Sequence, residues 1–327
     1  MSDPAVSYAA ARRGVALARR GERALVQVGG DDRARFLQGL LSNDVTGLQS
    51  GSGCRALFLD NKGHVRAVLD LWAGDDAIVI GSEPRFIDEV LPDLTRYILA
   101  ADVTVTDLRA DKAVLALLGP EADAVLGRAG AAAPAAGLYA HCGATIGGVA
   151  VRLARTPELA APGVELHVPV DGVEGVWSTL QQAAGPEPVS FAEGAAEALR
   201  VEAGLARMGR EITGDEFPQE LRLDDAINYE KGCYLGQETV ARIHYRGQVN
   251  RLLSGLRAER PLPAGAELVS SGRRVGTITS AAESPALGSI ALAMVRREES
   301  EAGATVEVSA DDAILGDARV VSLPIGA

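Results

Sequence analysis

The stretch NYEKGCYLGQETVARIHYRG, residues 228–247, divides the chain into two parts with different sequence patterns. Before it, strand-like runs alternate with segments whose apolar residues recur at helical spacing. After it, from Asn250 onward, short strand-like runs such as RLLSGLRAE, RRVGTITSAA and SIALAMVRR follow one another between turns that contain Gly or Pro. This change predicts a domain boundary near residue 249, which separates residues 1–249 from a C-terminal domain of residues 250–327.

The residues before the boundary show strands and helices in two successive rounds. In the first, RALVQVGG (23–30) reads as a strand followed by a helix, and CRALFLDNKGHVRAVLDLWAG (54–74) reads as a hairpin. In the second, the strands TIGGVAVRL and GVELHVPV precede the helix GVEGVWSTLQQAA, which Asp171 is expected to cap. Single helices between strands favour an α+β fold over a doubly wound sheet. We therefore predict two intertwined α+β lobes followed by a small C-terminal β-barrel.

The composition is that of a globular protein. Of 327 residues, 47% are hydrophobic and 23% are charged, which differs from the composition of disordered chains. The net charge of −12 argues against direct nucleic-acid binding over a broad face. No apolar run is long enough to cross a bilayer, and the N-terminal stretch carries arginines where a signal peptide needs apolar residues. We therefore expect a cytoplasmic protein without a membrane partner.

Cysteines and histidines form no recognisable framework. The cysteines are odd in number, far apart and in no C-x-x-C pair, so a disulfide framework is not expected. The histidines show no metal-ligand spacing, so no self-contained metal site is expected either. The residues concerned are Cys54, Cys142, Cys233, His64, His141, His167 and His244.

One cysteine has a distinctive setting inside the quoted stretch. Cys233 lies between Gly232 and Gly236, which allow the backbone to turn sharply and to approach a ligand closely. It also lies near Lys231, one of only three lysines, and just before the helix-like GQETVARI. A nearby cation and a helix N-terminus both lower the pKa of a thiol, so a reactive Cys233 is one interpretation. The competing interpretation is a small, buried and inert cysteine in a tight turn.

The segment is also basic within an acidic protein, which makes it a candidate anion-binding site. Five cations face two acids over residues 228–257. The cations are Lys231, Arg242, Arg246, Arg251 and Arg257, and the acids are Glu230 and Glu238.

At this point the sequence resembles a known family. KGCYLGQETVARIHYRG is similar to the signature K-G-C-[YF]-x-G-Q-E-x-x-x-R of the YgfZ/Iba57 family, folate-binding relatives of the glycine cleavage T-protein. Four further landmarks follow the same order along the chain as in that family. They are FLQGLLSNDV (36–45), ALFLDNKGHV (56–65), LRVEAGLARMGREI (199–212) and FPQELRLD (217–224).

The resemblance implies a cloverleaf-like α+β fold whose central channel accepts tetrahydrofolate or a derivative. It also implies a role in assembling or maintaining iron–sulfur clusters in client enzymes, including tRNA-modifying ones. By position, Glu202 resembles the carboxylate that pairs with the pterin ring, and a carboxylate can accept two parallel N–H donors there. An exposed helix residue is the alternative for Glu202. Cys233 becomes the candidate functional thiol, and the remaining folate-binding candidates are Lys231, Tyr234, Gln237, Arg242 and Arg246.

Two departures from the T-protein pattern argue against glycine cleavage itself. T-proteins carry an aspartate that assists one-carbon transfer where this chain has Ala67 and Val68, and Asp70 comes two residues late. Where T-proteins have D-F-I-G-R, this chain has CYLGQ, so Cys233 replaces an acid. The first hypothesis is therefore a folate-binding accessory protein for iron–sulfur enzymes. The alternative is a folate-dependent aminomethyl or other one-carbon transferase, and a tRNA-binding factor is a third reading that the net charge disfavours.

Overall fold

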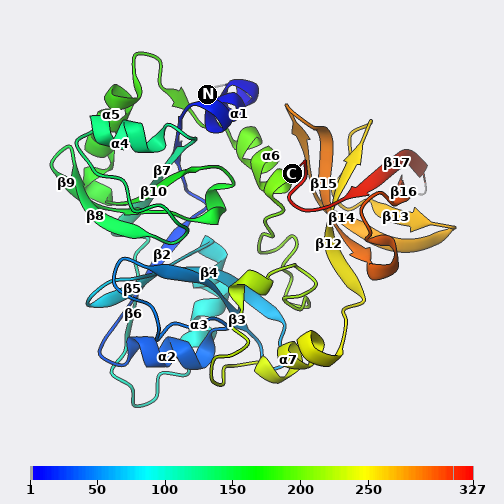
Figure 1. Cartoon of the computed structure of the whole chain (residues 1–327), viewed down its shortest axis with the longest axis horizontal. Helices are drawn as coiled ribbons and strands as arrows, with labels where there is room; N and C mark the ends of the chain where they lie inside the picture. Colours follow the sequence, from blue (N-terminus) through cyan, green and yellow to red (C-terminus); the bar gives the residue numbers. More distant parts are fainter. Residues whose placement is uncertain (1–2, 312, 327) are drawn as a thin grey trace. The chain divides into compact units, whose positions relative to one another are not determined.

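The computed structural model describes residues 3–311 and 313–326 (Figure 1). The chain forms two compact units. The first contains the residues up to 62, residues 66–191 and residues 225–237. The second contains residues 63–65 and 192–224 and the chain from 238 onward. The predicted domain boundary near residue 249 remains a prediction.

A five-stranded sheet in the first unit carries the first round of elements. Its strand order is β3-β4-β5-β2-β6. Helix α2 (Arg33–Leu40) follows β2 and buries Leu37 and Leu40. The strands are β2 (Ala24–Gly29), β3 (Gly53–Leu59), β4 (Val65–Ala73), β5 (Ala77–Ser82) and β6 (Thr104–Asp107).

A six-stranded sheet, also in the first unit, carries the second round in the order β11-β1-β7-β10-β9-β8. Helices α4 (Ala122–Arg128) and α5 (Val173–Ala184) pack into the apolar core that this sheet helps to form. Helix α1 (Pro4–Arg13) precedes β1. The strands are β1 (Ala16–Arg19), β7 (Lys112–Leu118), β8 (His141–Ile146), β9 (Val149–Ala154), β10 (Gly163–Pro169) and β11 (Val189–Ser190).

Two local predictions in this region are wrong. TIGGVAVRL is not one strand: β8 and β9 form a hairpin that turns at Gly147 and Gly148, both with positive φ, a conformation that glycine adopts at little steric cost. Asp171 does not cap α5, because it lies in a 3-10 turn and the cap position is Gly172.

The two sheets are intertwined, as predicted. Strand β1 joins the six-stranded sheet, whereas β2, the next strand along the chain, joins the five-stranded one. A shared apolar cluster contains Trp72 from β4 together with Val114 from β7 and Ala154 from β9. Burial of such side chains is the main favourable contribution to folding, so the two lobes of the first unit stabilise each other.

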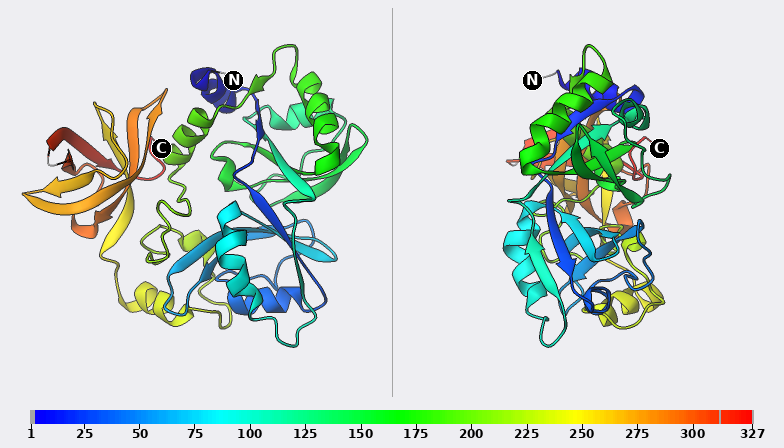
Figure 2. Two further views of the ribbon diagram at one scale, coloured as in Figure 1. Left: turned by 180° about the vertical axis from the view of Figure 1, so that it is seen from behind. Right: turned by 90° about the vertical axis from the view of Figure 1, so that its left-hand side faces the viewer.

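The second unit contains the predicted barrel and helix α6 (Glu193–Ala203). The barrel closes in the order β12-β15-β14-β13-β16-β17, and its alternating apolar residues fill the interior. Helix α6 packs against β14 and β15, and both ribbon views show this (Figures 1 and 2). The strands are β12 (Arg251–Ala258), β13 (Glu267–Ser270), β14 (Arg273–Ser284), β15 (Gly288–Arg296), β16 (Thr305–Ala310) and β17 (Ala313–Val321).

The remaining elements are short. They are a π-helical turn at Phe86–Val90, helix α3 (Leu91–Thr95), helix α7 (Gln237–Arg246) and 3-10 turns at Pro157–Leu159, Val170–Gly172, Asp224–Ala226 and Arg297–Glu299. None of the helices among the described residues has the length and apolarity that a bilayer-spanning helix needs.

Candidate functional site

Glu202 is a buried carboxylate at the end of α6, where the helix stops at Gly204 in the left-handed conformation. Only 2% of Glu202 is exposed, so the alternative of an exposed helix residue is wrong. A negative charge in the last turn opposes the helix dipole, so this carboxylate needs stabilising donors. Ser284, at the end of β14 in the same unit, donates its hydroxyl to Oε1 of Glu202.

The Ser284 hydroxyl is itself oriented by the backbone. Its oxygen accepts hydrogen bonds from the backbone N–H groups of Ala286 (3.1 Å) and Leu287 (3.0 Å). With its lone pairs engaged in this way, the hydroxyl hydrogen remains for Glu202. The carboxylate is therefore held by a donor whose direction the turn after β14 fixes. A fixed, buried carboxylate of this kind suits the paired N–H donors of a pterin ring.

Lys231 has a structural task that the sequence did not reveal. Its Nζ donates to the carbonyl oxygens of Gln38 (2.7 Å), Leu41 (2.6 Å) and Asn43 (3.0 Å), at and just after the C-terminal end of α2. An ammonium has three N–H donors, so all three are used, and a positive charge at a helix C-terminus is favourable. A compact ammonium fits these three converging acceptors better than a planar guanidinium does. Burial lowers the pKa of Lys231 to about 8, against the opposing effect of Asp44.

This geometry bears on two expectations for Lys231. Because its three donors already contact main-chain carbonyls, the lysine is accounted for without a folate ligand. Its assignment to folate binding, and its influence on the thiol of Cys233, stay predictions.

Asn228 and Ser42 anchor the signature segment, and neither was singled out from the sequence. The Oδ1 atom of Asn228 accepts from the N–H groups of Glu230 and Lys231, while its own N–H donates to the carbonyl of Ser42. The Ser42 hydroxyl donates to the carbonyl of Ala226 at 2.6 Å. The two contacts with Ser42 join residues more than 180 positions apart, so no local pattern could have indicated them.

Cys233 is exposed, and the alternative of a packed, buried cysteine is wrong. Three residues further on, Gly236 has a φ of +78°, which few other residues adopt readily. Tyr234, which lies between Cys233 and Gly236 in the sequence, is buried, and burial raises the pKa of its phenol to about 12. Its backbone N–H donates to Oε1 of Gln237 at 3.3 Å. The aromatic ring also lies 5.1 Å from Nζ of Lys231. Tyr234 therefore packs the turn, which leaves Cys233 open to solvent.

Arg242 and Arg246 are exposed on α7, a helix that buries only Val240 among its residues. Their guanidinium groups are accessible to an anionic ligand. Folate contacts remain a prediction for four residues, which are Tyr234, Gln237, Arg242 and Arg246.

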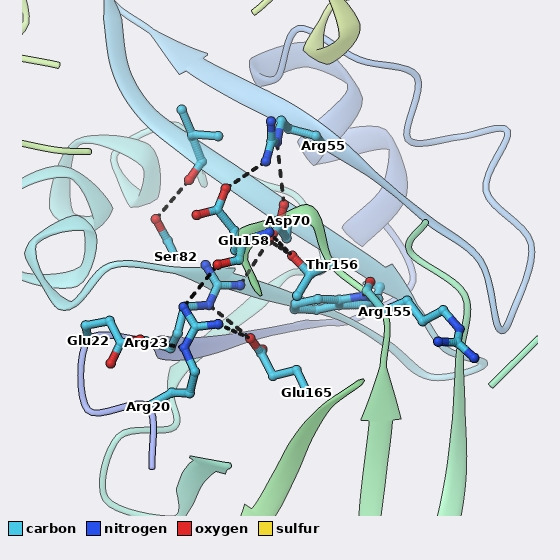
Figure 3. Close-up of polar contacts among 12 residues, drawn as sticks. Arg20, Glu22, Arg23, Arg55, Asp70, Ser82, Arg155, Thr156, Glu158 and Glu165 are labelled. Atoms are coloured by element: carbon cyan, nitrogen blue, oxygen red, sulfur yellow. Dashed lines mark hydrogen bonds and ion pairs between the residues drawn. The ribbon is translucent and has the colours of Figure 1, made fainter. Parts of the chain in front are cut away.

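Strand β4 lacks an accessible carboxylate where a transferase aspartate is expected. Ala67 is buried, and Val68 is half-buried. Asp70 is only 1% exposed, and its Oδ2 accepts hydrogen bonds from Arg23 (3.0 Å) and from the hydroxyl of Thr156 (2.6 Å) (Figure 3). Asp70 is therefore engaged inside the protein and is not placed to act on a substrate.

Asp70 belongs to a buried ionic network that links the two sheets of the first unit. Arg23, just before β2, lies 3.3 Å from Oε2 of Glu165 on β10, and His167 on the same strand hydrogen-bonds Oε1 at 2.9 Å (Figure 3 shows the Arg23 contacts). Burial alone would raise the pKa of Glu165, but Arg23 and His167 lower it to about 2. For Asp70 burial outweighs the attraction of Arg23, and its pKa is raised. Because these contacts join strands of both sheets, we interpret the network as stabilising the first unit.

Among the described residues, no group of three or more His, Cys, Asp or Glu side chains could hold a metal ion. All three cysteines are free. The described residues thus offer a fixed carboxylate at Glu202 and a single exposed thiol at Cys233.

Comparisons with known proteins agree on one family. Residues 5–231 match the GCVT N-terminal domain, and residues 251–325 match the glycine cleavage T-protein C-terminal barrel domain. The chain is 30% identical over 300 residues to an aminomethyltransferase of Rubrobacter xylanophilus, covering 90% of this chain and 78% of the relative. It is 27% identical over 289 residues to a putative chloroplastic transferase of Arabidopsis thaliana, covering 88% of this chain and 66% of the relative.

A solved structure has the same fold. The glycine cleavage system aminomethyltransferase T of Bartonella henselae superposes with a TM-score of 0.87 at 24% identity, covering 98% of this chain and 89% of that one. The predicted α+β fold with a C-terminal barrel is confirmed.

Proposed function

Because the chain belongs to the glycine cleavage T-protein family, whose aminomethyltransferases use tetrahydrofolate, we propose that it binds a reduced folate as a member of the YgfZ branch. In this proposal it is a cytoplasmic accessory protein that assists assembly or maintenance of iron–sulfur clusters in client enzymes, including tRNA-modifying ones. It does not itself run the glycine cleavage reaction.

The observation that carries folate binding is the buried carboxylate of Glu202, oriented by Ser284. The two oxygens of this carboxylate can accept two parallel hydrogen bonds from a pterin N–H and its adjacent amino group. Charge-assisted hydrogen bonds contribute about 1.5–3 kcal/mol each, so their loss is measurable.

Calorimetric titration with tetrahydrofolate tests this step. Glu202→Gln should weaken binding about tenfold or more, because an amide can accept but presents an unwanted donor to the ring. Glu193→Ala is the matched control, since Glu193 lies in the first turn of the same helix and is exposed. Equal affinities of the wild type and Glu202→Gln would contradict the assignment.

Strand β4 supports the accessory role over the transferase, because Ala67 and Val68 carry no carboxylate and Asp70, the one acid on this strand, is already engaged. A lipoyl-bound aminomethyl donor and tetrahydrofolate, supplied together, separate the two hypotheses. We expect folate binding without formation of methylenetetrahydrofolate. Turnover would establish the alternative, an aminomethyl or other one-carbon transferase.

Cys233 is the proposed functional thiol, and it is the cysteine that solvent reaches most readily. A single thiolate can hold a cluster fragment, an iron ion or a sulfur atom only transiently. Burial raises the pKa of Cys54 to about 12 and also raises the pKa of Cys142, so both should react slowly.

Alkylation followed by peptide mass analysis tests the thiol. Iodoacetamide should modify Cys233 first. Cys233→Ser should keep folate affinity but fail to restore client iron–sulfur enzyme activity in cells, whereas Cys142→Ser should restore it. A fully functional Cys233→Ser variant would overturn this part of the proposal without affecting folate binding.

A further inference from the structure

The outer face of the barrel carries an unusual row of side chains on three adjacent strands. The register pairs Arg257 on β12 with Arg319 on β17, and pairs Arg319 with Thr305 on β16. All three side chains are exposed, whereas their neighbours Leu256 and Val320 point into the barrel core. Directly opposite residues on one face of a sheet lie close enough for their side chains to interact.

A hollow of about 670 Å³ lies at this row. A volume of this size is within the range of small-molecule sites. The charged and polar side chains that line it are Arg257, Glu259, Arg260, Thr305, Asp317 and Arg319.

The charges in this hollow are not balanced by ion pairs. Like charges placed directly opposite on neighbouring strands destabilise a sheet, yet Arg257 and Arg319 are paired in this way and Arg260 adds a third guanidinium. Within residues 3–311 and 313–326, none of the three forms an ion pair, although Glu259 and Asp317 line the same hollow. A bound anion would relieve this repulsion, and three arginines together stand out in a chain of net charge −12.

The guanidinium groups keep most of their donors available. Arg257 donates one N–H to the carbonyl of Leu287 (3.1 Å), and Arg260 donates one to the carbonyl of Leu315 (3.3 Å). Each guanidinium has five N–H donors, so these contacts orient the groups without exhausting them. Thr305 adds a hydroxyl donor. Guanidinium and hydroxyl donors that line one hollow match the oxygens of a phosphate group.

We propose that this hollow binds a small phosphorylated molecule of about the size of a nucleoside monophosphate. The phosphate contacts Arg257, Arg319 and Thr305. Glu259 and Asp317 accept hydrogen bonds from hydroxyl or amino groups elsewhere on the ligand, which explains why carboxylates line a cationic hollow. The site lies on the barrel, and it does not depend on the folate-binding proposal.

Calorimetry at low salt with AMP, ribose 5-phosphate and inorganic phosphate tests the proposal on the full chain. AMP should bind more tightly than inorganic phosphate. Arg319→Gln and Arg257→Gln should each weaken AMP binding about ten- to a hundredfold, the loss expected for a charge-assisted pair. The control is Arg274→Gln, which removes a barrel charge that pairs with Glu267 at 2.8 Å and should leave AMP affinity unchanged.

Thermal unfolding supplies a second readout. Arg319→Gln should not lower the melting temperature, because it removes a repulsive pair; a structural role for Arg319 predicts a lower value. No AMP binding at millimolar concentration, equal affinity for AMP and inorganic phosphate, or an equal loss in Arg274→Gln would each overturn the proposal. Binding of a short RNA without binding of AMP would overturn it as well.

Discussion

Two buried carboxylates, Asp70 in the first unit and Glu202 in the second, differ in the contacts that hold them. Asp70 accepts from the guanidinium of Arg23 and from Thr156, within a network that crosses between two sheets. Glu202 is held at the end of a helix by Ser284, whose direction backbone N–H groups fix. Burial alone therefore does not mark a functional carboxylate. An acid embedded in ion pairs between two sheets stabilises them, whereas one aligned by an oriented hydroxyl at a helix end is suited to a ligand.

The largest expected effect tests the structural half of this comparison. Arg23→Ala would leave both Asp70 and Glu165 without their shared cation, and removing one partner of a buried ion pair costs about 3–5 kcal/mol. Urea unfolding of the full chain measures the loss. The control is Arg19→Ala, since the Arg19–Glu174 pair has side chains 46% and 80% exposed and solvent screening makes its contribution small. Equal effects would show that the network is not structural.

The dependence of the free energy of unfolding on pH in the acidic range tests the same network. The folded-state pKa of Glu165, about 2, lies below its ordinary value of 4.5, so its stabilisation is complete above that ordinary value. It is lost as the pH falls from about 4.5 to about 2, and a shift of this size corresponds to about 3 kcal/mol. The raised pKa of Asp70 acts in the opposite direction.

Comparison with Glu165→Gln isolates the contribution of Glu165. The difference in the free energy of unfolding between wild type and variant should shrink as the pH falls through this window. A difference that does not change with pH would show that Glu165 is not held ionised by Arg23 and His167.

Much of the fold was predictable because its patterns are local, and much of the site was not. The barrel strands alternate cleanly between turns, and Glu202 and Cys233 stand within recognisable motifs. TIGGVAVRL has the pattern of one strand, because the turn at Gly147 and Gly148 lies within an apolar run. The Glu202–Ser284 contact spans 82 positions. The partners of Lys231 lie about 190 positions away, and sequence spacing cannot reveal such pairings.

A smaller effect, on tetrahydrofolate affinity, tests whether Ser284 positions Glu202 for a ligand. Ser284→Ala removes the hydroxyl that orients Glu202, so tetrahydrofolate should bind about fivefold more weakly, corresponding to about 1 kcal/mol. The matched control is Ser280→Ala on the same strand, whose hydroxyl donates to Oε1 of Glu211 at 2.6 Å. It should lower stability without changing folate affinity. If both variants bind folate equally well, Ser284 does not position the carboxylate for the ligand.

At Lys231 two physical effects oppose each other. Burial disfavours the ammonium and lowers its pKa to about 8, while three carbonyl oxygens at 2.6–3.0 Å favour the charged form. Because the folded-state pKa lies below the ordinary 10.5, the unfolded chain binds more protons between these two values. Lys231 should therefore make stability rise with pH over that window, and the cost of its buried charge is present in full below about pH 8.

With three lysines in the chain, NMR of protein labelled with ¹⁵N-lysine can follow each Nζ separately, and Lys62 and Lys112 serve as internal references. Titration of Lys231 near pH 8 would show that desolvation outweighs the hydrogen bonds. Titration near 10.5 would show that the three carbonyl oxygens at the end of α2 compensate the cost of burial. Lys231 would then be charged at neutral pH and would hold residues 228–247 against the end of α2.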